Sequence, residues 1–122
     1  MLGQSRFVGF LASTDLARSQ AFFEALGLPC VEATPYACVH DANGTLIRVT
    51  AVPELTPQPF TVGGWEVTDL DAALHALAGA DVTTKRYNGM DQDERGVWTA
   101  PSGARIAWFD DPDGNTLSVT QT

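Results

Sequence analysis

The chain has 122 residues, enough for one domain with a hydrophobic core, and its 44% hydrophobic and 18% charged residues are typical of a globular protein. Its formal net charge of −8, from 15 acidic and 7 basic side chains, disfavours a nucleic-acid partner, because phosphates attract Lys and Arg. No apolar run approaches the roughly 20 residues of a membrane span, and the N-terminus lacks a signal-peptide pattern. We therefore expect a cytoplasmic protein with no membrane partner.

The first half of the chain predicts a strand, a helix and three further strands. An apolar run at 7–13 predicts the first strand. Thr14 and Asp15 offer N-caps for a helix, and Gly27 follows its apolar stripe as a left-handed cap. The runs 30–33, 36–40 and 46–51 predict three strands, separated by turns at 34–35 and 41–44. With a turn at 34–35, Cys30 and Cys38 would lie opposite each other, and we expect them to be a reduced pair.

The second half predicts the same order of elements after a linker at 53–59, which holds three prolines. Residues 60–67 predict a strand, and Thr68-Asp69 predicts the N-cap of a helix that Gly79 closes. Strands are then predicted at 81–85, 104–109 and 116–120. Residues 88–96 are polar and predict a mobile loop, while the Asp-Gly of residues 111–115 predicts a hairpin.

Two pairs of segments repeat each other along the chain. Residues 8–16 and 62–70 share five of nine positions at an offset of 54, and residues 41–50 echo residues 111–120. Such repeats indicate two copies of one structural unit. We therefore predict an α+β protein of two βαβββ repeats, at about 5–52 and 60–122, within a single domain 1–122.

This pattern resembles the vicinal oxygen chelate superfamily, which includes glyoxalase I, extradiol dioxygenases and bleomycin-binding proteins. The most specific segment is residues 109–117, Phe-Asp-Asp-Pro-Asp-Gly-Asn-Thr-Leu, which is similar to the family's signature before its last strand. Residues 14–23 resemble the start of its first helix. The resemblance covers essentially the whole chain, and it implies a curved, cup-shaped mixed sheet with helices on the outer face.

The resemblance also implies four positions at which relatives hold a metal ion. Carried onto this chain, these positions are Val8, Arg48, Val62 and Ser118. Valines offer no lone pairs, a protonated arginine repels a cation, and a lone serine hydroxyl is a poor ligand. His40 and His75 are expected to be structural or solvated rather than ligands. We therefore predict no metal site and no cofactor.

The cup is instead expected to bind a small organic ligand of cationic or aromatic character. Because side chains alternate along a strand, the expected lining includes Phe10, Thr50 and Glu66 beside the four former metal positions. Trp98 and Arg105 are expected to flank the same region. Trp65 and Trp108 are expected to face a helix, and Tyr87 and Asp91 could gate the cup. Glu66 and Arg48 are the candidate catalytic pair, although a structural salt bridge would explain them equally simply.

Three functions remain open on the sequence. The first is a metal-independent small-molecule-binding protein of the bleomycin-resistance type. The second is a metal-independent lyase or isomerase with Glu66 as base and Arg48 as electrostatic stabiliser. The third is a structural or regulatory dimer without a ligand. In each case the family habit and the exposed sheet edges predict a homodimer.

Overall fold

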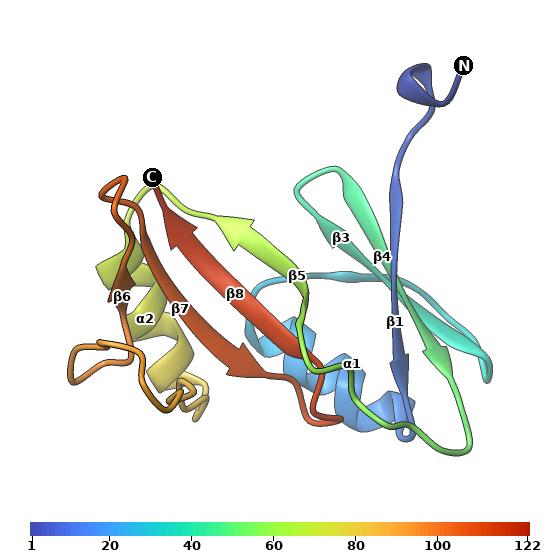
Figure 1. The fold of residues 1–122 in the computed structure, drawn as a ribbon. Helices are drawn as coiled ribbons and strands as arrows, with labels where there is room; N and C mark the ends of the chain where they lie inside the picture. Colours follow the sequence, from blue (N-terminus) through green and yellow to red (C-terminus); the bar gives the residue numbers. More distant parts are fainter. The chain divides into compact units, whose positions relative to one another are not determined.

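The computed structural model describes residues 1–122 as two compact units, Met1–Thr56 and Pro57–Thr122 (Figure 1). The boundary between them falls inside the predicted linker 53–59, which forms neither a helix nor a strand. Each unit contains one four-stranded mixed sheet and one α-helix, in the order strand, helix and three strands. The predicted fold class, α+β with two βαβββ units and helices beside the sheets, is therefore confirmed.

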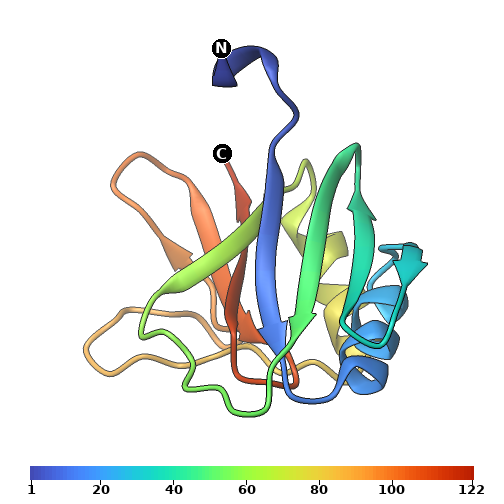
Figure 2. The same cartoon turned by 90° about the vertical axis from the view of Figure 1, so that its right-hand side faces the viewer.

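Unit 1 begins with a short 3-10 helix, η1 (Leu2–Gln4), which the sequence did not predict, and then forms its helix and sheet. Strand β1 (Val8–Ser13) is followed by helix α1 (Leu16–Ala25). Strands β2 (Cys30–Ala33), β3 (Ala37–Ala42) and β4 (Thr45–Ala51) complete the sheet. Its order is β1-β4-β3-β2, with β1 parallel to β4 and the other neighbours antiparallel (Figure 2).

Local sequence explains the ends of the unit 1 elements. The Asp15 carboxylate accepts a hydrogen bond from the backbone N–H of Arg18 and so caps α1, as predicted. Gly27 has φ 88°, the left-handed conformation expected after a helix. At the β3–β4 turn, Asn43 and Gly44 both have positive φ, as a two-residue type I′ hairpin requires.

The core of unit 1 lies between α1 and one face of its sheet. Phe23 of α1 is buried and packs against the imidazole of His40, whose ring centroid lies 5.4 Å away. The Nδ1–H of His40 donates to the Leu28 carbonyl at 3.0 Å, while Nε2 has no partner. His40 is therefore a structural residue of the core.

The β2–β3 hairpin has a different register from the predicted one. Cys38 lies opposite Ala33, and a bulge between Cys30 and Glu32 places Cys30 opposite His40. The two cysteines are therefore not direct cross-strand partners, although their thiols are close enough to interact through a side-chain hydrogen bond. Both are free thiols, and burial raises the pKa of the Cys38 thiol.

Unit 2 repeats the architecture with a shorter second strand. It comprises β5 (Thr61–Glu66), α2 (Leu70–Gly79), β6 (Trp98–Thr99), β7 (Arg105–Asp110) and β8 (Thr116–Gln121). The sheet order is β5-β8-β7-β6, with β5 parallel to β8. Asp69 caps α2 by accepting from the Ala72 N–H, as predicted. After α2 the left-handed residue is Asp81, φ 60°, rather than Gly79.

The predicted strand at 81–85 is not formed. Only Thr84 makes an isolated bridge, to Phe109, and the Lys85 N–H donates to the Trp108 carbonyl at 2.7 Å. The second strand of this sheet is instead the two-residue β6, which pairs Trp98 with Ile106. The run 81–85 has β-forming residues, but the chain turns away from β7 after Lys85 and returns at Trp98. No helix in the structure is both long enough and apolar enough to cross a membrane.

The turn before β8 is built around one buried carboxylate. Asp111 is 4% exposed and accepts hydrogen bonds from the backbone N–H groups of Asp113 and Asn115 and from the Asn115 side-chain amide, at 2.8–3.0 Å. Burial raises the pKa of Asp111, and these three donors act against that rise. The corresponding Asp41 of unit 1 is only half-buried, and its carboxylate accepts a hydrogen bond from the Gly44 N–H.

This difference between the two repeats gives a matched test. Asp111→Ala should lower the free energy of unfolding by about 2–3 kcal/mol, because it leaves buried donors without an acceptor. Asp41→Ala should cost about 1 kcal/mol or less, since it removes one exposed hydrogen bond. Urea denaturation of both variants measures the difference. Equal losses would contradict the role given to the Asp111 turn.

Candidate functional site

Each sheet has one face turned toward its helix and one turned away, which we call the distal face. In unit 2, Ala107, Phe109, Leu117 and Val119 are buried on the α2 side. Their strand neighbours therefore lie on the distal face, because side chains alternate. The register sets Trp108 beside Ser118, Asp110 beside Thr116, and Glu66 beside Thr120.

Three aromatic side chains gather on and beside the distal face of unit 2. The Trp108 ring lies 5.5 Å from Tyr87 in an edge-to-face arrangement and 6.5 Å from Trp98, measured between centroids. The prediction that Trp108 faces the helix is therefore wrong, because its neighbours Ala107 and Phe109 occupy that side. Trp65 does lie on the α2 side and stacks against Phe109 at 6.3 Å. We call Tyr87, Trp98 and Trp108 the aromatic cluster.

A lysine that the sequence analysis did not single out lies at one end of this cluster. Lys85 Nζ donates to Asp110 Oδ1 at 2.9 Å and to Thr116 Oγ1 at 3.1 Å, and it lies 5.7 Å from the centroid of the Tyr87 ring. The Thr116 hydroxyl in turn donates to Asp110 Oδ1 at 3.0 Å. The hydrogen bond to Asp110 raises the pKa of Lys85, and burial opposes this only in part. Lys85 therefore stays charged at neutral pH.

Lys85, Tyr87 and Trp108 line a cavity of about 510 Å³, which we call the Lys85 cavity. Its remaining walls come from the segment 57–61, Met90, Gly114 and Thr116. The whole cavity belongs to unit 2. Its volume falls within the roughly 300–1,000 Å³ typical of small-molecule sites.

Two predicted ligand-binding residues line a second, shallower depression on the same distal face. Glu66 and Ser118 border about 240 Å³ together with Gly64, Trp65, Thr120 and Thr122. The Glu66 side chain is exposed and accepts a hydrogen bond from the Thr122 hydroxyl at 3.2 Å. Val62 is the extra residue of a bulge in β5, so Thr61, and not Val62, pairs with Thr116.

The loop 88–96 is organised by two of its own side chains. The Gln92 amide donates to the carbonyls of Lys85 and Gly96 and accepts from the Tyr87 N–H, at 2.8–2.9 Å. The Asp93 carboxylate accepts from two backbone N–H groups of the loop. Although burial acts against it, these bonds lower the pKa of Asp93. Gln92 thus positions Tyr87 beside Trp108, while Asp91 is exposed. Gating by Tyr87 and Asp91 stays a prediction.

In unit 1, the register places the other predicted ligand-binding residues on one distal face. Val8 pairs with Leu46, Phe10 with Arg48, and Ala12 with Thr50. Phe10 is 67% exposed, and Arg48, its partner on β4, is half-buried. The structure thus brings Val8, Phe10, Arg48 and Thr50 together. A pairing of Arg48 with Glu66 stays a prediction, because these residues belong to different units.

Arg105 does not share the face of Trp98. It lies on the α2 side of β7, where its guanidinium is 3.4 Å from Asp71 of α2. Arg95 approaches the same carboxylate at 2.7 Å, and hydrogen bonds from both arginines lower the pKa of Asp71. The expectation that Arg105 flanks the same region as Trp98 is therefore wrong, because the two side chains lie on opposite faces of the sheet.

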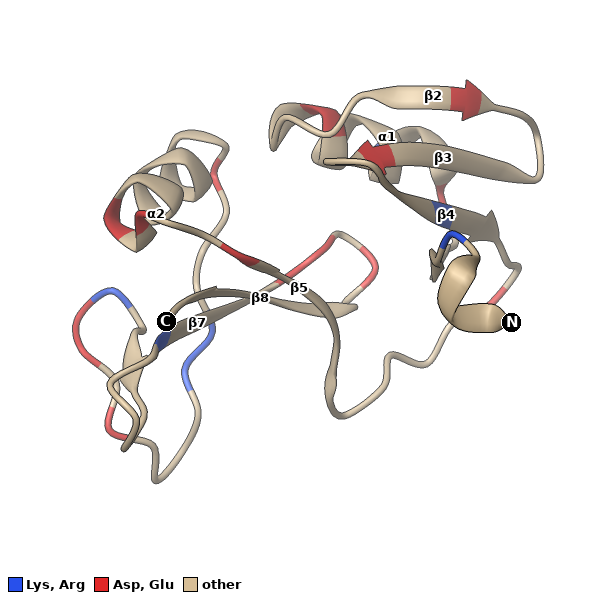
Figure 3. Ribbon diagram, turned by 90° about the horizontal axis from the view of Figure 1, so that it is seen from above, with Lys and Arg blue, Asp and Glu red and all other residues tan.

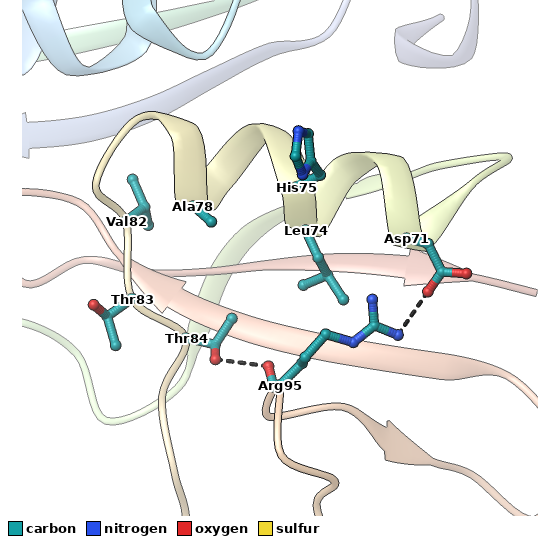
Figure 4. Close-up of a pocket in the computed structure, with 8 residues that line it drawn as sticks. All are labelled: Asp71, Leu74, His75, Ala78, Val82, Thr83, Thr84 and Arg95. Atoms are coloured by element: carbon teal, nitrogen blue, oxygen red, sulfur yellow. Dashed lines mark hydrogen bonds and ion pairs between the residues drawn. The ribbon is translucent and has the colours of Figure 1, made fainter.

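Asp71 and Arg95 also border a cavity of about 440 Å³ beside α2 (Figure 4). Leu74 points from the helix toward the strands, whereas His75 projects from another side of the helix and is exposed. The charged groups of this cavity are bound to each other, and the Thr84 hydroxyl donates to the Arg95 carbonyl at 2.8 Å. The arrangement connects α2 to the loop, and we do not regard it as the ligand site.

No group of three or more His, Cys, Asp or Glu side chains in the chain is placed to hold a metal ion. At the four positions implied by the family resemblance, the side chains are Val8, Arg48, Val62 and Ser118, and these do not fit a divalent cation. His40 is buried against Phe23 in the unit 1 core, and His75 lies exposed on α2. No step of a mechanism is therefore assigned to a metal.

The fold matches solved structures of bleomycin-binding and glyoxalase-family proteins over nearly the whole chain. A bleomycin-binding protein complexed with bleomycin matches with a TM-score of 0.75 and 20% identity, covering 98% of this chain and 99% of that one. A glyoxalase-family protein from Bacillus anthracis matches with a TM-score of 0.77 and 13% identity, covering 98% and 95%. Lactoylglutathione lyase from Agrobacterium tumefaciens matches with a TM-score of 0.73 and 14% identity, covering 97% of this chain and 93% of that one.

No protein-family model and no curated protein sequence matches the chain. The chain thus has the fold shared by bleomycin-resistance and glyoxalase-family proteins, as the sequence resemblance predicted. At these identities the likeness establishes the fold, and function has to be argued from the site.

The packing of β5 against β8 gives a second matched test. A Cβ added at Gly64 would collide with the Ser118 hydroxyl and lie 3.0 Å from its carbonyl oxygen. At Gly63 the nearest atom would be Leu117 Cδ2 at 3.7 Å, an ordinary contact. Gly64→Ala should therefore destabilise the protein by about 1–3 kcal/mol, and Gly63→Ala should change stability by less than about 1 kcal/mol. Thermal unfolding of both variants checks this, and a reversed order would show that the β5–β8 approach is looser than described.

Proposed function

We propose that the protein is a small-molecule-binding protein of the glyoxalase and bleomycin-resistance-like type, which acts without a metal ion. The observation that carries the proposal is the aromatic cluster on the distal face of unit 2, where Tyr87 and Trp108 line a cavity of about 510 Å³. Aromatic walls with a few aimed polar groups are typical of ligand sites. The match to a bleomycin-binding protein complexed with bleomycin supports this class of function.

The ligand is proposed to be aromatic, cationic or both. Unit 2 carries ten acidic and four basic side chains, a formal net charge of −6, so its overall field attracts a cation (Figure 3). The aromatic cluster offers surfaces for a flat ring or a cation. We propose that predicted residues of each unit contact a ligand, namely Val8, Phe10, Arg48 and Thr50 in unit 1, and Val62, Glu66, Trp98 and Ser118 in unit 2.

Metal independence rests on the chemistry of the side chains. The family's metal-assisted reactions need a cation that polarises a substrate oxygen. Two valines, an arginine and a serine at the four positions supply no imidazole, carboxylate or thiolate. Binding without a metal is the function that this set of side chains supports.

A metal-independent lyase or isomerase is the alternative. It would use Glu66 as base and Arg48 as electrostatic stabiliser of the developing negative charge. The Glu66 carboxylate is exposed and accepts a hydrogen bond from the Thr122 hydroxyl. Glu66→Gln separates the two functions, because it should abolish turnover by an enzyme, whereas a binding protein should keep most of its affinity.

We also propose that the protein is a cytoplasmic homodimer. Within its own sheet each of β1 and β5 is an edge strand, and Phe7, Phe10 and Phe60 on or beside these strands are exposed. Unpaired edges and exposed aromatic side chains favour association with a second chain. If the dimer is instead purely structural, no small molecule should stabilise it.

A thermal-shift screen tests the proposal directly. Aromatic and cationic compounds should raise the melting temperature, because a ligand at 100 times its Kd adds about 2.7 kcal/mol of stability. Zn²⁺, Ni²⁺, Mn²⁺ and Fe²⁺ should produce no saturable increase. Saturable stabilisation by one of these metals would contradict metal independence, and stabilisation by no compound would favour the structural dimer.

A further inference from the structure

Lys85 is the single lysine of the chain, and it occupies a position that the proposed binding function leaves unexplained. It lies between helix α2 and strand β6 in the sequence, and its Nζ reaches the start of β8 and the end of β7 through Thr116 and Asp110. Its side chain is 30% exposed, so it is held at the rim of the sheet and still reaches the Lys85 cavity.

The hydrogen bonds of Lys85 leave one donor for a ligand. A lysine ammonium has three N–H donors and no acceptor. Asp110 Oδ1 and Thr116 Oγ1 take two of them, at 2.9 and 3.1 Å. Within the chain the third has no oxygen or nitrogen acceptor, and the Tyr87 ring at 5.7 Å is only a weak electrostatic partner.

The other walls of the cavity combine flat and apolar surfaces with the uncharged polar side chains of Gln58, Thr61 and Thr116. Phe60, Tyr87 and Trp108 contribute rings, and Pro57, Pro59 and Met90 contribute hydrocarbon or thioether surface. Lys85 is the single charged residue of this lining. A group that fits these walls is a planar ring system, and a group that fits the free ammonium donor is an anionic or strongly accepting oxygen.

We propose that the Lys85 cavity binds the part of the ligand that carries an aromatic carboxylate or a comparable ring-bound oxygen anion, with Lys85 as its counter-ion. The inference rests on the proposed binding function and adds the chemical class that this subsite selects. The Lys85 ammonium group acts at short range and orients the bound ligand. The net charge of unit 2 acts at longer range, while the ligand approaches the protein. A ligand that has a ring-bound anion at Lys85 and a cationic group outside the Lys85 cavity is compatible with both charges.

Asp110 sets the strength of this subsite. Its carboxylate lies 2.9 Å from Lys85 Nζ and competes with the ligand's anion for the same charge. Asp110 also holds Lys85 in place, helped by the Thr116 hydroxyl. Removing the charge of Asp110 while keeping its shape should therefore strengthen binding of an anion. Because the Asp110 hydrogen bond raises the pKa of Lys85, the ammonium stays charged and affinity should be constant between about pH 6 and pH 9.

Isothermal titration of the full chain with three probes tests the inference. The probes are 1-naphthoate, 1-naphthylmethanol and 1-naphthylmethylamine, which share a ring system and differ in charge. Wild-type protein should bind naphthoate about tenfold or more tightly than the alcohol. Lys85→Met should remove that preference, and Asp110→Asn should increase the affinity for naphthoate.

Arg86→Met is the matched control, since it removes the same charge one position away from a side chain that does not line the cavity. It should leave naphthoate affinity within about twofold. Thermal melts of all variants verify that they fold. Lys85→Arg keeps the charge and should retain a measurable part of the preference for naphthoate. This variant replaces Lys85→Met in the test if Lys85→Met folds poorly.

The outcomes separate this inference from the proposed function. Naphthoate binding that Lys85→Met and Arg86→Met reduce equally would overturn the role of Lys85. Preferential binding of the amine, unchanged by Lys85→Met, would overturn the inference and still support a small-molecule-binding protein. No binding of any naphthyl probe would also overturn the inference, while the wider thermal-shift screen would still decide the proposed function.

Discussion

The two-residue alternation of side chains along β8 sets both the core and the site of unit 2. Leu117 and Val119 are buried on the α2 side, so Thr116, Ser118 and Thr120 must lie on the distal face. Residues paired across hydrogen-bonded strands lie on the same face of the sheet. The pairing of β8 with β7 and β5 therefore puts Trp108 beside Ser118 and Glu66 beside Thr120. A slip of one residue would exchange the hydrocarbon core for hydroxyl and charged groups. The packing of the core therefore fixes the register of the strands and, with it, the side chains that lie on the distal face.

The segment that joins β7 to β8 shows how closely the two roles are connected. Asp110 lies on the distal face and binds Lys85, while the next residue, Asp111, is buried and accepts three hydrogen bonds that form the turn. Adjacent carboxylates thus serve the site and the fold separately. Because Thr116 follows this turn and also binds Lys85, distortion of the turn would move two of the partners that hold the ammonium group. The Lys85 cavity consequently depends on a feature of the core.

Local patterns in the sequence predicted the features that depend on nearby residues. The caps Asp15 and Asp69 were predictable, because each carboxylate binds an N–H only three residues away. The face of Trp108 was predicted wrongly, since alternation yields a face only once the phase of the strand is known, and buried Ala107 and Phe109 set that phase. The bulge in β5 and the contacts of Lys85 with residues 25 and 31 positions later are tertiary features without a local signal.

We propose that a ligand binds at the aromatic distal face of unit 2 and not at a metal centre. The three tryptophan indole N–H signals in a ¹H–¹⁵N correlation spectrum test it most directly, because Trp98 and Trp108 lie on the distal face and Trp65 lies on the α2 side. Titration with a naphthyl compound should shift the Trp98 and Trp108 signals and leave the Trp65 signal in place. Saturable shifts of backbone signals at Val8, Arg48, Val62 and Ser118 on adding Zn²⁺, with both distal tryptophans unmoved by the organic compound, would contradict the account.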